Sequence, residues 1–306
     1  MLILAGEGSA YRLSLKNNRL PIRIQRVSAV IVTFNNALML RELIRDLYSQ
    51  TYPPDHIIVV DNASDDKTPE VMKEDFPGVE YMRLRENTGS AGGYYIGMKA
   101  ALRNSDMIWT LDDDVRLYDN SLQELLQGFE DLGDNGQVGA VRSVGRAHPH
   151  SLPTEFETCP WRGSLIRTDA VKKVGLPSKD YFIYGEDLEY SLRMKKNGFK
   201  FFWIPSSKCV EMRDGKTNDR LFGRAVRIYP SNFRLYYAFR NEFSIYLKYR
   251  YPIKFARTFL YALKVILYIL LAHRANSGDK LKAVAVGFVD GIQGTLGKND
   301  RYLPGK

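Results

Sequence analysis

Strand-type and helix-type patterns alternate along the first part of the chain. Short stretches typical of buried strands, several of them continuous runs rich in β-branched residues, cover 27–34, 56–64, 79–85 and 106–114. Apolar positions at helical spacing predict helices over 38–50, 68–75 and 94–104. This alternation predicts an α/β domain with a mainly parallel sheet flanked by helices.

Three consecutive carboxylates, Asp112, Asp113 and Asp114, follow the fourth of these strands. In an extended strand Asp112 and Asp114 face one side and Asp113 the other. Neighbouring like charges disfavour the ionised form of each other unless a cation lies among them. Oxygen ligands suit magnesium or manganese. A solvated acidic turn is the alternative interpretation of the triplet alone.

Polar residues also follow the other predicted strands. Asn35, Asp61 and Asn87 each come soon after one of them. In open α/β sheets, ligands bind beyond the carboxyl ends of the strands. The four polar strand ends therefore predict a binding cleft at one edge of the sheet.

A glycine-rich segment, 86–97, contains Gly89, Gly92, Gly93 and Gly97. Glycines let a backbone approach a ligand closely and leave amides free at a helix N-terminus, which suits phosphate. The segment is neither a Walker A loop nor a dinucleotide fingerprint. A plain flexible loop is the alternative.

A second acidic group, Glu186, Asp187 and Glu189, lies at the start of a helical pattern within 181–198. Acidic residues in the first turn of a helix are favoured by its macrodipole. A carboxylate that faces a cleft can instead act as general base for a hydroxyl nucleophile. Both interpretations stay open at this point.

Charge is unevenly distributed. The chain carries a formal net charge of +9, yet from Leu221 onward fifteen Lys and Arg stand against four acidic residues. A basic, tyrosine-rich region is typical of a surface that binds nucleic acid or an anionic membrane. A solvated basic face is the alternative. The 44% apolar and 26% charged residues are those of an ordinary globular protein.

The segment 255–274 is strongly apolar but interrupted by Arg257 and Lys264. Its longest uncharged run, 265–272, is far shorter than the roughly 20 residues that span a bilayer. Flanking basic residues and tyrosines predict a helix that lies on the inner leaflet of a membrane or packs in a homo-oligomer. A buried helix that closes the catalytic domain is the alternative.

Two cysteines, Cys159 and Cys209, provide neither a disulfide framework nor paired metal-ligand spacing. This usage is typical of a reducing compartment. The first fifteen residues lack the apolar segment of a signal peptide. We expect a cytoplasmic protein.

Six ordered motifs, spread over residues 27–241, resemble the family-two inverting glycosyltransferases, which have the GT-A fold and use nucleotide-diphosphate sugars. They are "VIVTFNN", "IIVVDNASDD", "RENTGSAGGYYIGM", "LDDDV", "WRGSLIRTDAVKKVGLPSKDYFIYGEDLEYSLR" and "RLYYAFRN". The resemblance implies an N-terminal extension over 1–26, a GT-A catalytic domain over 27–220, and a helical, basic region over 221–306.

The resemblance also implies roles for single residues. Asp112 is expected near the ribose and the metal, Asp114 as a ligand of manganese or magnesium, and Asp187 as the base, with Glu186 beside it. Many relatives have a histidine ligand near the position of Glu211, so this carboxylate is the expected third ligand. The remaining donor-binding residues are expected to be Thr33, Asn35, Asp61, Asn87, Gly92, Gly93 and Asp113.

Trp161 precedes the "RGSLI" segment. Its ring is expected either to stack on an acceptor sugar or to pack in the core. The glycine segment and "DDDV" look most like galactofuranosyltransferases and neighbouring rhamnosyltransferases of bacterial surface polysaccharide assembly. We expect UDP-galactofuranose as donor, dTDP-rhamnose as the alternative, and a glycan or lipid-linked acceptor.

Two other classes fit less well. A nucleotidyltransferase is expected to carry a basic triphosphate loop near its first strand, and "TFNNALML" lacks one. A nucleic-acid-binding protein would use the basic tail but leaves the acidic groups unexplained, since carboxylates in a cleft repel phosphate. We therefore expect no nucleic-acid partner.

Overall fold

The computed structural model describes residues 11–12, 22–23, 25–133, 136–146, 149–212, 217–221, 224–229, 231–272 and 277–303. The described chain divides into two compact units. The first contains the described residues up to Asn87 together with Tyr94–Leu176 and Arg193–Met212. The second contains Thr88–Gly93, Pro177–Leu192 and the described residues from 217 onward.

A nine-stranded sheet forms the centre of the first unit. Eight of its strands lie in the order β5-β4-β3-β6-β10-β8-β11-β7, and β9 pairs with β11. The strands are β3 (Val27–Thr33), β4 (His56–Asp61), β5 (Glu80–Arg83), β6 (Met107–Asp112), β7 (Val115–Leu117), β8 (Val138–Val144), β9 (Thr154–Glu155), β10 (Ser164–Arg167) and β11 (Lys200–Glu211). The predicted parallel arrangement holds for β5, β4, β3 and β6. Antiparallel β10 then makes the sheet mixed.

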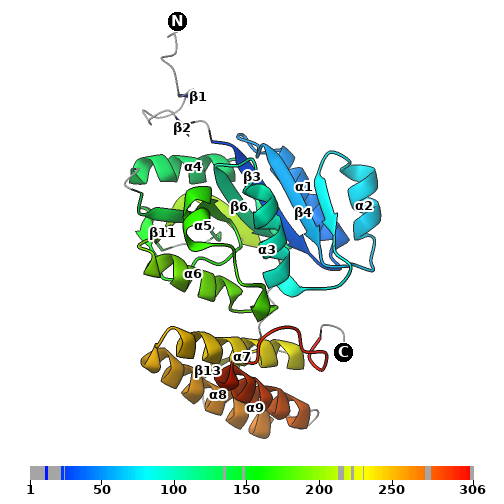
Figure 1. The fold of residues 1–306 in the computed structure, drawn as a ribbon, viewed down its shortest axis with the longest axis vertical. Helices are drawn as coiled ribbons and strands as arrows, with labels where there is room; N and C mark the ends of the chain where they lie inside the picture. Colours follow the sequence, from blue (N-terminus) through cyan, green and yellow to red (C-terminus); the bar gives the residue numbers. More distant parts are fainter. Residues whose placement is uncertain are drawn as a thin grey trace, which may run out of the picture. The chain divides into compact units, whose positions relative to one another are not determined.

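Helices cover both faces of this sheet, as predicted. They are α1 (Ala37–Tyr48), α2 (Thr68–Asp75), α3 (Gly89–Ala101), α4 (Ser121–Leu132) and α5 (Thr168–Val174). Helix α6 (Glu186–Lys196) has its residues up to Leu192 in the second unit. Buried side chains of β3 and β4 join those of α1, α2 and α4 in one hydrophobic core. On the other face Gly97 of α3 packs on Val30 and Val60, where a Cβ would collide. In Figure 1, α1 lies behind the strands and α3 in front of them.

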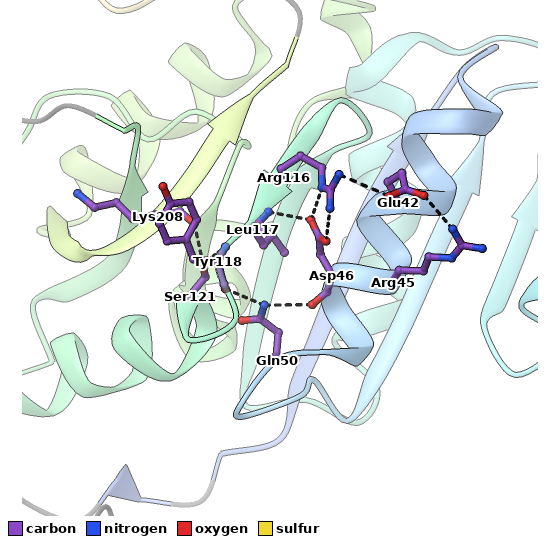
Figure 2. A network of polar contacts seen from close by, with 9 residues as sticks. All are labelled: Glu42, Arg45, Asp46, Gln50, Arg116, Leu117, Tyr118, Ser121 and Lys208. Atoms are coloured by element: carbon purple, nitrogen blue, oxygen red, sulfur yellow. Dashed lines mark hydrogen bonds and ion pairs between the residues drawn. The ribbon is translucent and has the colours of Figure 1, made fainter. Parts of the chain in front are cut away.

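A polar network joins α1 to the strand that follows the acidic triplet (Figure 2). Asp46 of α1 accepts hydrogen bonds from Arg116 Nε at 2.7 Å, Arg116 Nη2 at 2.9 Å and the backbone N–H of Leu117 at 3.0 Å. Gln50 Nε2 donates to the carbonyl of Tyr118 at 2.9 Å. These bonds fix β7, and with it the exit of the chain from the triplet.

The second unit is largely helical. Its helices α7 (Asn232–Lys248), α8 (Pro252–Ala272) and α9 (Ser277–Gln293) pack against one another around an aromatic-rich core (Figure 1). It also holds the 3₁₀ turn η1 (Lys179–Tyr181) and the hairpin of β12 (Thr217–Leu221) and β13 (Arg224–Ile228).

Near the N-terminus, in the first unit, β1 (Tyr11–Arg12) pairs with β2 (Ile22–Arg23). No described helix combines the length and hydropathy needed to cross a bilayer.

The predicted strand 56–64 ends at Asp61, and two further predicted boundaries, at α3 and β6, are wrong. Helix α3 begins at Gly89 rather than at 94, so the glycine-rich segment is helical and not a loop. Strand β6 ends at Asp112, so Asp113 and Asp114 form a turn and the strand alternation expected for the triplet does not reach them. In α3, close packing on the sheet outweighs the low helix propensity of glycine.

Candidate active site

The carboxyl ends of the central strands lie side by side. The strand register sets Thr33 of β3 opposite Asp61 of β4, and Val32 of β3 opposite Asp112 of β6. Three predicted site residues from distant parts of the sequence therefore meet at one edge of the sheet. This is the edge at which open α/β sheets bind ligands.

Asp61 and Asn35 are joined through Ser64. The backbone N–H of Ser64 donates to Asp61 Oδ1 at 2.8 Å, and Ser64 Oγ accepts from the N–H of Asn35 at 2.9 Å. The other carboxylate oxygen of buried Asp61 accepts from the Tyr81 hydroxyl at 2.5 Å. The carboxylate of Asp61 thus shapes the loop after β4, and its predicted contact with the donor stays a prediction.

Each carboxylate of the triplet, the acid turn of residues 112–114, has its own surroundings. The Tyr94 hydroxyl of α3 donates to Asp112 Oδ1 at 2.8 Å. Asp113 Oδ2 accepts from Thr33 Oγ1 at 2.6 Å and so ties the turn to β3. Asp114, the predicted metal ligand, comes directly before β7.

The acid turn holds more negative than positive charge. Burial raises the pKa of Asp112, raises the pKa of Asp113 to about 6, and, with repulsion from the neighbouring carboxylates, raises the pKa of Asp114 to about 7. Glu211 contributes to the increase at Asp112 and Asp114, whereas Arg162 opposes it. A cation close to the turn would favour the ionised carboxylates.

Glu211 reaches this region through strand pairing. It lies opposite Val115 in the antiparallel pair of β11 and β7, and its carboxylate forms an ion pair with Arg162. Within the described ranges, no three His, Cys, Asp or Glu side chains are arranged as a metal site. Glu211 as third metal ligand stays a prediction.

The residues nevertheless suit a hard cation. Magnesium is commonly held by one or two carboxylates plus phosphate oxygens of the substrate, so the protein need not supply a complete cage. Asp112 and Asp114 provide oxygen atoms at a half-buried point where negative charge is in excess. The chemistry of these donors therefore fits manganese or magnesium.

The glycines have a different setting from the one expected. Gly92 and Gly93 lie inside α3 and are buried, and a Cβ at Gly92 would collide with Thr88. At the helix start, the N–H of Ala91 donates to the carbonyl of Phe182 at 3.0 Å. This amide is therefore already bonded to the protein. Asn87 lies just before the helix and is half-buried.

Trp161 is packed rather than open. Only 4% of it is exposed, and its ring stacks on Tyr94 with centroids 4.9 Å apart. The Trp161 carbonyl accepts from Thr110 Oγ1 at 2.6 Å. This burial favours the interpretation of Trp161 as a core residue over stacking on an acceptor sugar. Its ring packs against Tyr94, whose hydroxyl bonds Asp112.

In the second unit, burial separates the three acidic residues at the start of α6. Glu186 is buried and accepts a hydrogen bond from Ser90 Oγ at 2.5 Å. Glu189 is buried and accepts from Lys248 Nζ at 3.0 Å and from the Tyr249 hydroxyl at 2.7 Å. Asp187 is half-buried and is the least buried of the three.

Sequence reasoning missed several residues that shape the site. Tyr94 and Ser64 lie inside motifs that were recognised, but neither carries a charge that would draw attention. Arg162 directly follows Trp161 and is the first residue of the "RGSLI" segment. Its position in that motif was the available signal.

Comparison with known proteins agrees with the predicted family and fold. The Glycosyl transferase family 2 profile matches residues 28–182. The chain belongs to this family, and it is a nucleotide-sugar glycosyltransferase with the GT-A fold. The predicted family, fold class and enzyme class are confirmed.

Individual relatives cover different parts of the chain. The galactofuranosyltransferase GlfT1 of Mycolicibacterium smegmatis is 30% identical over 202 residues, which cover 57% of this chain and 67% of that protein. The dTDP-rhamnosyl transferase RfbF of Shigella flexneri is 25% identical and covers 89% of this chain and 97% of its own. The mannosyltransferase PcManGT of Pyrobaculum calidifontis, solved with GDP-Man and Mn²⁺, superposes with a TM-score of 0.55 at 19% identity, covering 86% and 74% of the two chains.

Proposed function

We propose that this enzyme transfers galactofuranose from UDP-galactofuranose, with inversion at the anomeric carbon, to a glycan or lipid-linked acceptor in surface polysaccharide synthesis. The acid turn carries the proposal, because half-buried carboxylates in excess of the adjacent Arg162 suit a phosphate-bearing donor only through a cation. The GlfT1 relative supports this donor. The RfbF relative makes dTDP-rhamnose the alternative.

Asp112 and Asp114 would hold manganese or magnesium together with phosphate oxygens of the donor. When bound, this cation supplies positive charge that neutralises the departing nucleoside diphosphate. Tyr94 fixes Asp112 through its hydroxyl, and Thr33 fixes Asp113. The protein therefore orients the carboxylates before the donor arrives.

Asp187 acts as the general base. It takes the proton of the acceptor hydroxyl while the hydroxyl oxygen forms a bond to the anomeric carbon and the bond from that carbon to the diphosphate breaks. Attack from the face opposite the diphosphate inverts the configuration. Asp187 is preferred to Glu186 because it is half-buried, whereas Glu186 is buried against Ser90.

The donor is tested by incubating the purified protein and manganese with UDP-galactofuranose or dTDP-rhamnose and measuring release of the nucleoside diphosphate. We expect release from UDP-galactofuranose, its loss with EDTA, and its recovery with manganese or magnesium. Release from dTDP-rhamnose alone would establish the alternative donor. Full turnover by metal-free Asp114→Ala protein would overturn the metal assignment.

The base is tested with Asp187→Asn, which keeps the shape of the side chain and removes its basicity. The chemical step should fall by about two to four orders of magnitude, the usual contribution of a general base, while donor affinity persists. A collapse of donor affinity without loss of turnover would make Asp187 a binding residue. Glu186→Gln would then be tested as the base.

We also propose that α8 rests on an anionic membrane surface and so brings the enzyme to a lipid-linked acceptor. One face of α8 packs in the helical core through Ala262, Val265 and Ile269. Its exposed large apolar side chains are Ile253, Phe259, Leu260, Leu263, Leu267, Leu270 and Leu271. The helix contains three basic residues and no acidic one. An exposed apolar stripe with cations beside it suits the boundary between headgroups and acyl chains.

A further inference from the structure

The loop that leads into α6 has an unusual backbone. Phe182 and Tyr184 have φ angles of 63°, and Gly185 has a φ of 85°. Bulky residues rarely adopt the left-handed region, so two of them within three positions need support from their surroundings. Because α6 begins at Glu186, the path of this loop sets the position of Asp187.

Asn241 of α7 supplies much of that support. Its Nδ2 lies 2.9 Å from the carbonyl oxygens of Tyr181 and Ile183 and 2.5 Å from that of Tyr184. The side chain is fully buried. One amide group therefore binds three carbonyl oxygens of the loop, and no solvent competes for these bonds.

Arg240 orients that amide and binds the loop itself. Its Nε donates to Asn241 Oδ1 at 2.8 Å, and its Nη2 donates to the carbonyl of Tyr181 at 2.9 Å. A third bond, from Nη1, reaches the carbonyl of Gly297 at 2.6 Å. The guanidinium also lies 4.6 Å from the centre of the Tyr237 ring.

Arg240 is only 1% exposed, and the three oxygens that it binds are neutral. Burial of a cation against neutral acceptors is unfavourable compared with an apolar side chain of similar size. A buried arginine in this position therefore contributes something other than stability. Its bonds reach the loop before α6, the Asn241 side chain that binds the same loop, and the segment around Gly297.

The opposite side of the loop is held by the start of α3. The Phe182 carbonyl accepts from the N–H of Ala91, and a Cβ at Gly89 would collide with that carbonyl. The left-handed conformation of Phe182 thus presents its carbonyl to α3, while Asn241 and Arg240 bind the carbonyls on either side of it. The loop is pinned from two directions.

We propose that Arg240 and Asn241 are positioning residues that hold Asp187 in place for proton transfer. The inference rests on the proposed function of Asp187 as general base. Neither residue touches the reacting atoms. They act through the backbone of residues 181–185, and the rate of the chemical step depends on them because misplacement of a reacting group by about 1 Å can lower a rate by up to about a hundredfold.

Asn241→Asp tests the proposal, because it keeps the size of the side chain and the acceptor for Arg240 but replaces the donor with an oxygen. We expect kcat for UDP release from UDP-galactofuranose, or dTDP release from dTDP-rhamnose, to fall between about tenfold and a hundredfold. KM for the donor should stay within about twofold, because the substitution leaves the acid turn, where we propose that the donor binds, unchanged. Glu242→Gln is the matched control. Glu242 is the next residue on α7, and its carboxylate accepts a hydrogen bond from Thr258 of α8 instead of binding the loop.

Arg240→Lys is the second variant, and it keeps the charge while losing the forked geometry. We expect kcat to fall in this variant too, but by less than in Asn241→Asp. Hydrogen exchange of residues 181–187, measured without any donor, should accelerate in both variants and stay unchanged in Glu242→Gln. Unchanged exchange and unchanged kcat in Asn241→Asp would overturn the proposal.

A double variant separates this inference from the proposed function. If Asn241 acts through Asp187, adding Asn241→Asp to Asp187→Asn should lower kcat no further. If Asp187→Asn alone keeps full turnover, the base assignment fails and the positioning role fails with it. If Asp187→Asn is inactive but Asn241→Asp is fully active, only the positioning role is overturned.

Discussion

Tyr94 connects helix α3 to the acid turn through a single buried hydroxyl. Its ring stacks on Trp161, and the hydroxyl donates to Asp112. This hydrogen bond favours the ionised form of a carboxylate whose burial favours the protonated form. A residue with no role in the chemistry thereby orients a carboxylate that we propose as a metal ligand.

Tyr94→Phe removes this hydroxyl and leaves the ring. We expect a loss of about 2 kcal/mol in the free energy of unfolding, because a buried charge-assisted hydrogen bond disappears. The manganese concentration that gives half-maximal donor turnover should rise. Tyr52→Phe is the control, since that hydroxyl bonds a backbone carbonyl of Gln25. An equal manganese requirement in both variants would contradict the role given to Tyr94.

Single-residue roles could be predicted only in part from the sequence. The acidic residues at 112–114 and 186–189 were identified because clustered carboxylates are costly unless they have a purpose. Which of Glu186, Asp187 and Glu189 is accessible depends on Ser90 and Lys248, which lie 96 and 59 residues from their partners. Local patterns carry no information on contacts at such separations.

At the scale of elements, the acid turn is held between two strands that are themselves anchored. Strand β6 lies inside the parallel sheet, whereas β7 is short and at an edge. The bonds from Asp46 to Arg116 and Leu117 attach this edge strand to α1 (Figure 2). The geometry of Asp114 therefore depends on a helix that contributes no predicted site residue.

Asp46→Ala should destabilise the first unit by about 2–3 kcal/mol, because the carboxylate is largely buried and accepts three hydrogen bonds. Glu42→Ala is the matched control on the same helix. Its carboxylate is 40% exposed and pairs with Arg45 and Arg116, so its loss should cost less than about 1 kcal/mol. Thermal unfolding measures both. Equal losses in the two variants would show that Asp46 is no more than a surface ion pair.

The strands 27–34, 56–64 and 106–114 and the helix 68–75 were predictable because each presents a strong local pattern. The early start of α3 was not, since Gly89 and Gly97 are poor helix formers and are required by neighbours in space. The pairing of β10 between β6 and β8 was not predicted either. Pairing between distant strands leaves no periodic signal in the sequence.

At the scale of the whole molecule, the basic charge and the exposed leucines coincide. The region from Leu221 onward carries the excess of Lys and Arg, and α8 within it has the exposed apolar stripe. Leu260, for example, is 64% exposed. Such a surface is unfavourable in water unless a partner covers it.

Flotation with anionic liposomes tests membrane contact. We expect association at low salt that weakens at high salt, with Arg257→Gln reducing it by about 1 kcal/mol of binding free energy. Leu260→Glu should abolish association, while Leu38→Glu, at a 75% exposed leucine of α1, should not. Absence of flotation in both salts, with a dimer that Leu260→Glu dissociates, would identify a second copy of the chain as the partner instead.

The two cysteines can report when the first unit opens. Cys159 and Cys209 are both buried in the first unit, and burial raises the pKa of Cys209 to about 12. A buried, protonated thiol does not react with thiol reagents until its surroundings open. The rate of thiol labelling therefore measures the opening of the first unit alone, because the second unit contains no cysteine.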